Sequence, residues 1–502
     1  MKSSLLSESF FRLSATAAVF ACLGACGGAG ATESTTPSST ASAGESQKTA
    51  ENPPASGPAR DVKFPKIERF TLANGLEVNV VPSHALPLAY ATLIVKSGAE
   101  ASPKDMPRLS HLVAAMLEEG TRTRTSAQIA DEIEYLGSSI YVSDGAENIS
   151  VGVGALTDQF EKALELLADV AQNPSFKDDE LKKLKAREND RLTMRENEPK
   201  FLAKRELFRA VYGTHPYAIT DTTKAVVKKV KRTDLASWHK KHFVPSNAVL
   251  VVVGDITAEA AKAATEKVFG AWKGKPVPAV AYPALAERTT REIIVVDRPA
   301  SEQSVIYIGN LALTRSSADY VPLLVANQVL GGAPSSRLFM DLREKRSLSY
   351  GAYSSVDESL DVGLFLAMAN VRNDVTKEAL AAFFEHLDRI IKEAPPEEEL
   401  RESERFLTDR FPLEIDSAQS IAGLVSDLRI FGLPDGYWET YRSEISKVTA
   451  AEALAAAQKY IRPDKSVVVV VGKAEAVVPA LEAYGKVTVL DRQGKPVAPA
   501  KK

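Results

Sequence analysis

Hydrophobic and polar residues alternate along the chain with two different periods, which predict strands in some segments and helices in others. Residues 64–99 hold two runs with alternating apolar residues, separated by the pair Asn74–Gly75, which is typical of a tight hairpin turn. Residues 108–120 and 125–137 carry apolar residues at three- and four-residue spacing, and each segment ends at a glycine. The folded part is therefore expected to begin with strands and to continue into helices.

The same order of periods occurs twice, which predicts an internally duplicated chain. The first half is expected to continue with a strand region, two helices and a closing strand, at residues 140–156, 157–174, 177–198 and 246–256. The second half is expected to hold a strand pair, a helix, a strand, a helix and a closing strand and helix, at residues 290–313, 320–332, 362–371, 377–394 and 465–485. Each half should be an α/β layer structure in which helices cover one face of a largely antiparallel sheet.

Composition sets the class of protein and its division into parts. The chain has 502 residues, of which 45% are hydrophobic and 25% charged, so two or more cores are expected. A formal net charge of -3 and the lack of a strongly basic domain argue against a nucleic-acid partner. The expected parts are a signal peptide, a tether, an N-terminal domain, a Pro-rich linker, a C-terminal domain and a tail, at residues 1–26, 27–62, 63–272, 273–287, 288–490 and 491–502.

The N-terminus has the features of an export signal. Lys2 and Arg12 precede an apolar run that is too short to span a bilayer, which predicts a cleaved signal peptide. Residues 23–26, Leu-Gly-Ala-Cys, resemble the bacterial lipoprotein signal, and this resemblance implies that Cys26 is acylated and becomes the new N-terminus. The alternative is an ordinary signal peptide that is cut after residues 29–31.

Lipidation would fix both the location and the cysteine chemistry of the mature chain. Cys22 and Cys26 are the only cysteines, so after cleavage no thiolate is left for catalysis or zinc binding. The following stretch is rich in Ser, Thr, Ala, Gly and Pro, and is expected to be an unfolded tether to a membrane. Gly27 and Gly28 lack the aspartate that often retains lipoproteins at the inner membrane, which favours the periplasmic face of the outer membrane.

Four motifs resemble the pitrilysin/insulinase family, which includes the mitochondrial processing peptidase. They are SHLVAAMLEEGT, VYGTHPYA, HFVPSNAVLVVVGD and LGGAPSSRLFMDLREKRSLSYGAYS, at residues 110–121, 211–218, 242–255 and 330–354. The resemblance covers about residues 63–490 and implies two homologous halves, each a mainly antiparallel sheet covered by helices. It also implies a zinc-peptidase ancestry.

Active members of that family carry the motif H-x-x-E-H on one helix, which brings two imidazoles to one zinc ion. By this resemblance His111 matches the first histidine, while Ala114 and Ala115 stand in place of the glutamate and the second histidine. A further glutamate is expected on the charged helix of residues 186–199, where Arg191 stands in its place. The zinc motif is therefore degenerate, and no metal or other cofactor is expected in this chain.

Two alternatives for His111 remain open from the sequence. One is a histidine that packs or forms hydrogen bonds within a helix pair. The other is a rearranged metal site built on His111 with Asp190 or Glu188, although the nearby cation Arg191 would repel zinc.

Arg343 and Tyr350 reproduce the family's Arg-Tyr pair, which in active relatives holds the substrate's peptide backbone beside the zinc. A guanidinium and a phenol are donors that can grip carbonyl oxygens and stabilise developing negative charge. The competing interpretation is structural, with Arg343 in a salt bridge at a helix end and Tyr350 filling a sheet face. Family resemblance favours substrate binding by both residues.

A lost zinc motif beside a retained Arg-Tyr pair implies a particular division of labour. Some bacterial members of the family consist of two chains, one with zinc and one with only the Arg-Tyr pair. The sequence thus predicts a lipid-anchored, non-catalytic subunit that positions extended peptides for a partner with an intact H-x-x-E-H motif. Two other possibilities are a scaffold without a peptidase partner and a self-sufficient peptidase with a rearranged site.

Overall fold

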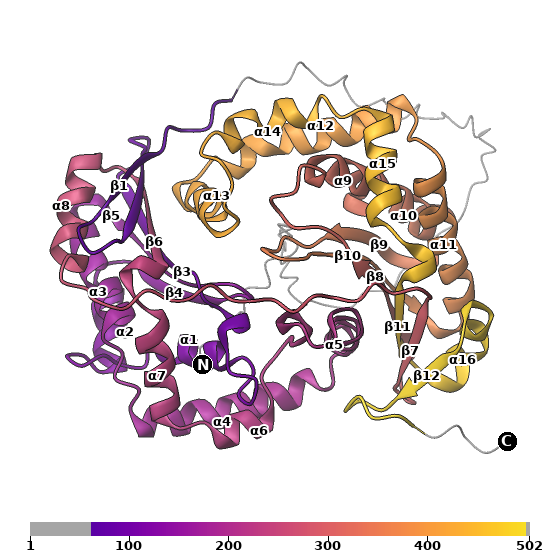
Figure 1. Ribbon diagram of the computed structural model, residues 1–502, viewed down its shortest axis with the longest axis horizontal. Coiled ribbons are helices and arrows are strands. Elements are labelled where there is room, and N and C mark those ends of the chain that lie inside the picture. Colours follow the sequence, from indigo (N-terminus) through magenta and orange to yellow (C-terminus); the bar gives the residue numbers. More distant parts are fainter. Residues whose placement is uncertain (1–61, 498–502) are drawn as a thin grey trace, which may run out of the picture. The chain divides into compact units, whose positions relative to one another are not determined.

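The computed structural model describes residues 62–497 (Figure 1). The predicted signal peptide, Cys26 and nearly all of the predicted tether lie outside the described residues. Within residues 62–497, no helix is long and apolar enough to cross a membrane. The described chain is built on two six-stranded mixed sheets, one in each half, which confirms the predicted fold class.

The N-terminal sheet has the order β1-β2-β6-β3-β5-β4. Its strands are β1 (Glu68–Thr71), β2 (Glu77–Pro82), β3 (Leu88–Val95), β4 (Ser139–Asp144), β5 (Ile149–Leu156) and β6 (Ala248–Gly254). Strands β2 and β6 are parallel, and all other neighbours are antiparallel. The hairpin predicted at Asn74–Gly75 is confirmed, because Thr71 pairs with Glu77 and Gly75 has a positive φ of 92°.

The C-terminal sheet has the order β12-β7-β11-β8-β10-β9. Its strands are β7 (Glu292–Asp297), β8 (Gln303–Leu311), β9 (Ser349–Val356), β10 (Leu364–Arg372), β11 (Val467–Gly472) and β12 (Val487–Leu490). Five strands of each sheet follow in the same spatial order, β2-β6-β3-β5-β4 and β7-β11-β8-β10-β9, which confirms the internal duplication. The sequential strands β7 and β8 do not pair as predicted, because β11, buried along its whole length, lies between them.

Sixteen helices surround the sheets within the described residues. In the first half they are α1 (Leu109–Met116), α2 (Ser126–Tyr135), α3 (Phe160–Gln172), α4 (Asp178–Arg195), α5 (Pro199–Tyr212), α6 (Lys224–Lys229), α7 (Arg232–His242) and α8 (Ala258–Phe269). In the second half they are α9 (Tyr320–Asn327), α10 (Arg337–Phe339), α11 (Thr376–Lys392), α12 (Glu397–Glu414), α13 (Ala418–Ile430), α14 (Tyr437–Ile445), α15 (Ala450–Tyr460) and α16 (Ala474–Leu481). Between Phe269 and Glu292, where the Pro-rich linker is expected, the chain has neither helix nor strand.

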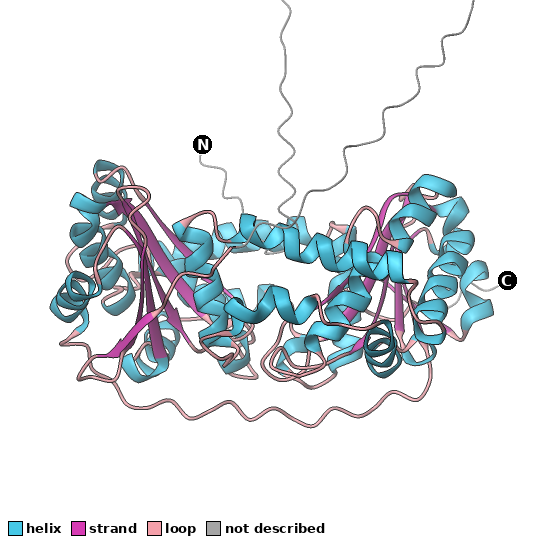
Figure 2. Ribbon diagram, turned by 90° about the horizontal axis from the view of Figure 1, so that it is seen from above, coloured by secondary structure: helices cyan, strands magenta, loops and turns pink. Residues whose placement is uncertain are grey.

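One helix of each half packs against the sheet of the other half. Helix α5 packs against β8 and β11 of the C-terminal sheet, whereas α13 packs against β3 and β6 of the N-terminal sheet (Figure 1). Helices thus lie on both sides of each sheet (Figure 2). The sequence predicted helices on one face only, and that part of the prediction is wrong. The exchange explains why β6 and β11 are buried on both faces and consist almost entirely of valine and other small apolar residues.

Candidate functional site

Helix α1 carries the degenerate zinc motif with its apolar residues turned into the N-terminal core. Leu112, Val113 and Met116 are almost fully buried, and they fix the rotation of the helix. Ala114 is 5% exposed and belongs to the core, while Ala115 is half-buried and packs against it. Neither position offers an atom that could bind a metal or move a proton.

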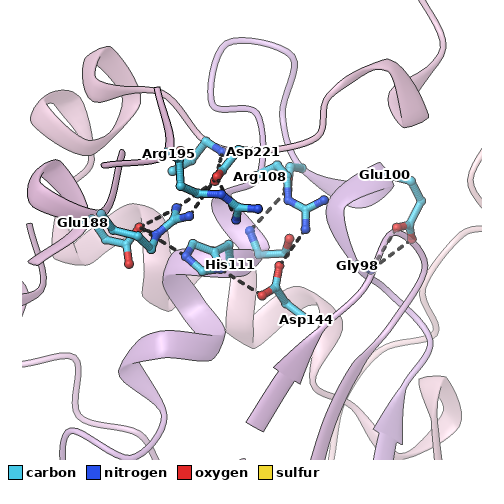
Figure 3. Close-up of polar contacts among 12 residues, drawn as sticks. Gly98, Glu100, Arg108, His111, Asp144, Glu188, Arg195 and Asp221 are labelled. Atoms are coloured by element: carbon cyan, nitrogen blue, oxygen red, sulfur yellow. Dashed lines mark hydrogen bonds and ion pairs between the residues drawn. The ribbon is translucent and has the colours of Figure 1, made fainter. Parts of the chain in front are cut away.

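His111 on α1 is held between two carboxylates (Figure 3). Its Nδ1 atom lies 2.9 Å from Oδ1 of Asp144 at the end of β4, and its Nε2 atom lies 3.2 Å from Oε2 of Glu188 on α4. Arg108, which precedes α1, donates to the other oxygen of Asp144 at 3.1 Å. The imidazole therefore ties a helix, a strand and a second helix together.

Arg191 extends this network away from α1. Its Nε atom donates to Glu188 at 2.8 Å, and its two terminal nitrogens donate to the two oxygens of Asp221 at 2.8 and 2.7 Å. This fork-to-fork geometry is the strong arrangement for an arginine–carboxylate pair. Arg195 reinforces it from the next turn of α4, 3.4 Å from Asp221. Asp190, in contrast, is exposed on α4.

The network holds its members in their charged forms. Burial alone would lower the pKa of His111, but the hydrogen bonds to Asp144 and Glu188 outweigh it and raise the pKa to about 9. Burial likewise favours the neutral forms of Asp144 and Glu188, yet the imidazolium and the nearby arginines lower both pKa values to about 2. At neutral pH the cluster is thus a set of compensated ion pairs.

The residues at the motif do not fit a zinc site. Both nitrogens of His111 are already engaged, and they face opposite directions, so Asp144 and Glu188 cannot join the imidazole around one ion. Arg191 places a guanidinium on Glu188, the remaining carboxylate. Within residues 62–497, no group of three or more His, Cys, Asp or Glu side chains could hold a metal ion.

Arg343 and Tyr350 lie in the C-terminal half and are both accessible. Arg343 sits in a π-helical turn, Met340–Lys345, where its side chain is 49% exposed. It is 3.3 Å from Glu344, and its guanidinium lies 4.8 Å from the ring centre of Phe339. Tyr350 is 87% exposed near the start of β9, so it does not fill a sheet face.

Strand β9 is an edge of the C-terminal sheet, and within residues 62–497 it pairs with β10 alone. An edge strand leaves a row of backbone donors and acceptors unpaired, and an extended peptide can add to such a row as a further strand. Strand β4, which ends at Asp144, is the corresponding edge of the N-terminal sheet. Tyr350 lies on this edge strand, and Arg343 lies in the turn that precedes it.

The sequence did not identify several residues that organise this region. Asp144 and Asp221 complete the ion network, but each lies in a separate loop or strand end that no local motif marks. Glu147, in the turn after β4, accepts hydrogen bonds from the Tyr217 hydroxyl and from the backbone nitrogen of Leu360 in the opposite half. Burial raises the pKa of this carboxyl.

His215, which the sequence left without a role, also contributes to this contact between the halves. Its Nε2 atom lies 3.1 Å from Asp361, and its ring stacks on Tyr282 at 5.0 Å between centroids. The family motif of residues 211–218 thus joins the two halves and does not contribute to the histidine–carboxylate network.

Comparison with known proteins agrees with this architecture. The model for the insulinase family, peptidase family M16, matches residues 80–221, and the model for the peptidase M16 inactive domain matches residues 229–407. Together the two models cover well over half of the chain. The chain belongs to the peptidase M16 family.

Individual M16 relatives differ in what their names claim. An "uncharacterized zinc protease" of Bacillus subtilis is 25% identical over 70% of this chain and 86% of its own length. A "non-peptidase homolog" of Helicobacter pylori is 22% identical over 74% of this chain and 85% of its own. The crystal structure of a peptidase M16 inactive domain from Pseudomonas fluorescens, 27% identical, superimposes with a TM-score of 0.77 and covers 81% of this chain and 98% of its own.

Proposed function

We propose that this M16 chain is a non-catalytic peptidase subunit, which binds extended peptides and presents them to a partner chain that carries zinc. The observation that carries the proposal is the contrast between the two candidate sites. The position of the zinc motif is filled by a compensated ion network around His111, whereas Arg343 and Tyr350 remain accessible.

Arg343 and Tyr350 would supply hydrogen bonds and positive charge to the substrate backbone. A peptide added to the edge of β9 would pair its backbone with the strand that carries Tyr350. The phenol and the guanidinium would then be available for a carbonyl oxygen of that peptide, where negative charge develops during hydrolysis. These two residues bind and orient the substrate, and the partner would provide the water-activating metal.

The partner is expected to be an M16 chain with an intact H-x-x-E-H motif. Lipidation of Cys26 would place the complex at the periplasmic face of a membrane, with the outer membrane preferred. Isolation of the chain from solubilised envelopes, followed by mass spectrometry of whatever co-purifies, tests both parts. The expected result is an acylated N-terminal cysteine and a zinc-bearing M16 chain in equal amounts, and the control is a Cys26→Ala variant, which should lose the acyl group.

A scaffold that binds peptides or proteins without any peptidase partner is the second candidate. It is favoured by the match to an inactive-domain model and by the relative named a non-peptidase homolog. The two proposals differ in one observable result. A scaffold would co-purify without a zinc-bearing M16 chain, and its complex would not cut peptides.

A further inference from the structure

A hollow lies in the N-terminal half, and none of its lining residues belongs to either candidate site. It has a volume of about 880 Å³ and is walled by α7, by the bend between α3 and α4, by the segment after α1 and by the end of α8. Helix α7 contributes Arg232, Ala236, His239 and Lys240, whose spacing places them on one helix face, and Phe243 directly follows the helix. We call it the basic hollow because of the charges described next.

Five cations line the basic hollow, and one carboxylate, Asp178, faces them. The cations are contributed by four separate segments of the chain and are Arg122, Lys177, Arg232, Lys240 and Lys273. All five are exposed, and none forms a salt bridge with a carboxylate anywhere in residues 62–497. Four positive charges are thus left unbalanced at this place, in a protein whose formal net charge is -3.

These cations differ from others in the same half of the chain because they gather around one hollow with a single carboxylate. Some exposed lysines elsewhere on the N-terminal half are paired with a carboxylate within 3.0 Å, as in Lys183–Glu180, Lys224–Glu196, Lys229–Asp105 and Lys267–Glu165. Others, such as Lys96 and Lys104, form no salt bridge within residues 62–497, but they do not line this hollow. Like charges that gather without counter-charges repel one another and weaken the folded state, so a bound anion would relieve a cost that the fold otherwise bears.

The inner surface of the basic hollow is formed by packed rings and hydrogen-bonded groups, and His239 there contributes no charge. The His239 ring stacks on Phe243 at 4.3 Å, meets Phe176 edge-on at 5.6 Å, and bonds through Nε2 to the carbonyl of Ala171 at 2.8 Å. Burial lowers the pKa of His239 to about 4, so the imidazole is neutral at physiological pH. Ser175 donates to the carbonyl of Gly120. The cations alone are therefore available for a ligand.

We propose that the basic hollow binds a ligand that bears two or more phosphate groups. One phosphate monoester carries a charge of about -1.5 to -2 near pH 7, so two such groups would balance the four excess cations. Lysine and arginine from four segments can surround the ligand and contact several phosphate oxygens at once. Soluble oligophosphates and phosphorylated lipid headgroups share this chemistry, and the experiment below separates them.

The test compares two triple variants with the same change in net charge. Arg122→Gln/Lys177→Gln/Lys240→Gln removes cations from the basic hollow. Lys96→Gln/Lys104→Gln/Lys377→Gln removes exposed cations that lie outside the hollow and form no salt bridge within residues 62–497. Binding of inorganic tripolyphosphate is measured by calorimetry at near-physiological salt. Binding to phosphatidylcholine vesicles with and without phosphatidylinositol 4-phosphate is measured by co-sedimentation, since this lipid headgroup carries two phosphate groups.

The expected result is saturable binding of at least one of the two probes by the wild-type chain. The basic-hollow variant should bind that probe at least about tenfold more weakly, while the control variant should stay within about twofold. Binding of tripolyphosphate alone would identify a soluble ligand, and binding of the vesicles alone a lipid headgroup. Equal losses in both variants, or no saturable binding of either probe, would overturn the proposal. If the triple variant does not fold, Lys240→Gln against Lys96→Gln repeats the comparison with single changes.

Discussion

The Nε2 atom of His111 lies 3.2 Å from Oε2 of Glu188, and this contact joins the helix of the zinc motif to the helix that would carry the distal ligand. In a zinc site these two groups would both turn toward the metal. Here they bond to each other, and Arg191 bonds to the same oxygen of Glu188 at 2.8 Å. A guanidinium thus provides positive charge beside the carboxylate, where an active relative would hold a metal cation.

The His111 network should make stability depend on pH. The pKa of His111 is raised from 6.5 to about 9 in the folded chain, so its contribution is complete below about pH 6.5 and is lost as the pH rises toward 9. At about 1.4 kcal/mol per pKa unit the loss should be about 3 kcal/mol. Denaturant titrations across this range measure it.

A His111→Asn variant should flatten this part of the pH profile, while His84→Asn, at an exposed histidine, should leave it intact. The same slope in the wild-type chain and in His111→Asn would contradict the interpretation.

The two carboxylates should make the unfolding free energy depend on pH in the opposite direction, at acid pH. The pKa values of Asp144 and Glu188 are lowered to about 2, so their contribution is lost as the pH falls from about 4 toward 2.

Removal of the guanidinium should cost more than removal of an ordinary surface charge. Arg191→Met removes the cation that bridges Glu188 and Asp221, and leaves these carboxylates with only His111 and Arg195 as cationic partners. We expect a cost toward the lower end of the about 3–5 kcal/mol that follows when one partner is removed from a buried ion pair. Arg372→Met, where the arginine is 60% exposed and pairs with Asp374, should change the unfolding free energy by less than about 0.5 kcal/mol. Equal effects in the two variants would show that the network is not stabilising.

The isolated chain should neither retain zinc nor be stabilised by it. Because both nitrogens of His111 are bonded to carboxylates, we expect substoichiometric zinc after purification and no change of melting temperature on addition of zinc or a chelator. Elemental analysis and thermal melts measure these quantities. About one tightly bound zinc per chain would instead support the rearranged peptidase site with Glu188.

The exchange of α5 and α13 should make the halves depend on each other. A fragment of residues 62–280 would expose the face of β6 that carries Val249, Val251 and Val253, because α13 is missing. We expect the fragments 62–280 and 281–497 to aggregate when expressed alone and to co-purify when expressed together. Val425→Asp on α13, at a fully buried position, should abolish the association.

Single fragments that are soluble and folded would contradict this dependence. A charge at an exposed position of the same helix, Gly423→Asp, is the matched control and should leave the association intact.

The spacing of apolar residues predicted most of the helices and strands. The closing strand at residues 246–256 and the one that begins the segment 465–485 were recognisable because both are short, apolar and followed by a helical pattern. The duplication followed from the repeat of that order. The insertion of β11 between β7 and β8 was not predictable in this way, because local patterns define strands but not their neighbours. The exchange of α5 and α13 was missed for the same reason.

The candidate sites were predictable to different degrees. Motif resemblance located His111, Ala114 and Ala115 on one helix and Arg343 and Tyr350 in the other half, and the structure gives their surroundings. The resemblance did not identify the partners of His111, because Asp144 lies 33 residues away and Glu188 77 residues away, on other elements. Side chains that meet only through tertiary packing leave no local signal in one sequence.

Cleavage of a peptide by the reconstituted complex tests the central claim most directly, namely that this chain supplies Arg343 and Tyr350 to a partner's zinc site. We expect no cleavage by either chain alone, chelator-sensitive cleavage by the pair, and a fall in kcat/KM of about 100-fold or more with Arg343→Ala or Tyr350→Phe. The controls Arg410→Ala on α12 and Tyr135→Phe on α2, at exposed positions outside β9 and β10, should retain full activity. Unchanged turnover in the Arg343 and Tyr350 variants, or chelator-sensitive cleavage by the isolated chain, would contradict the claim.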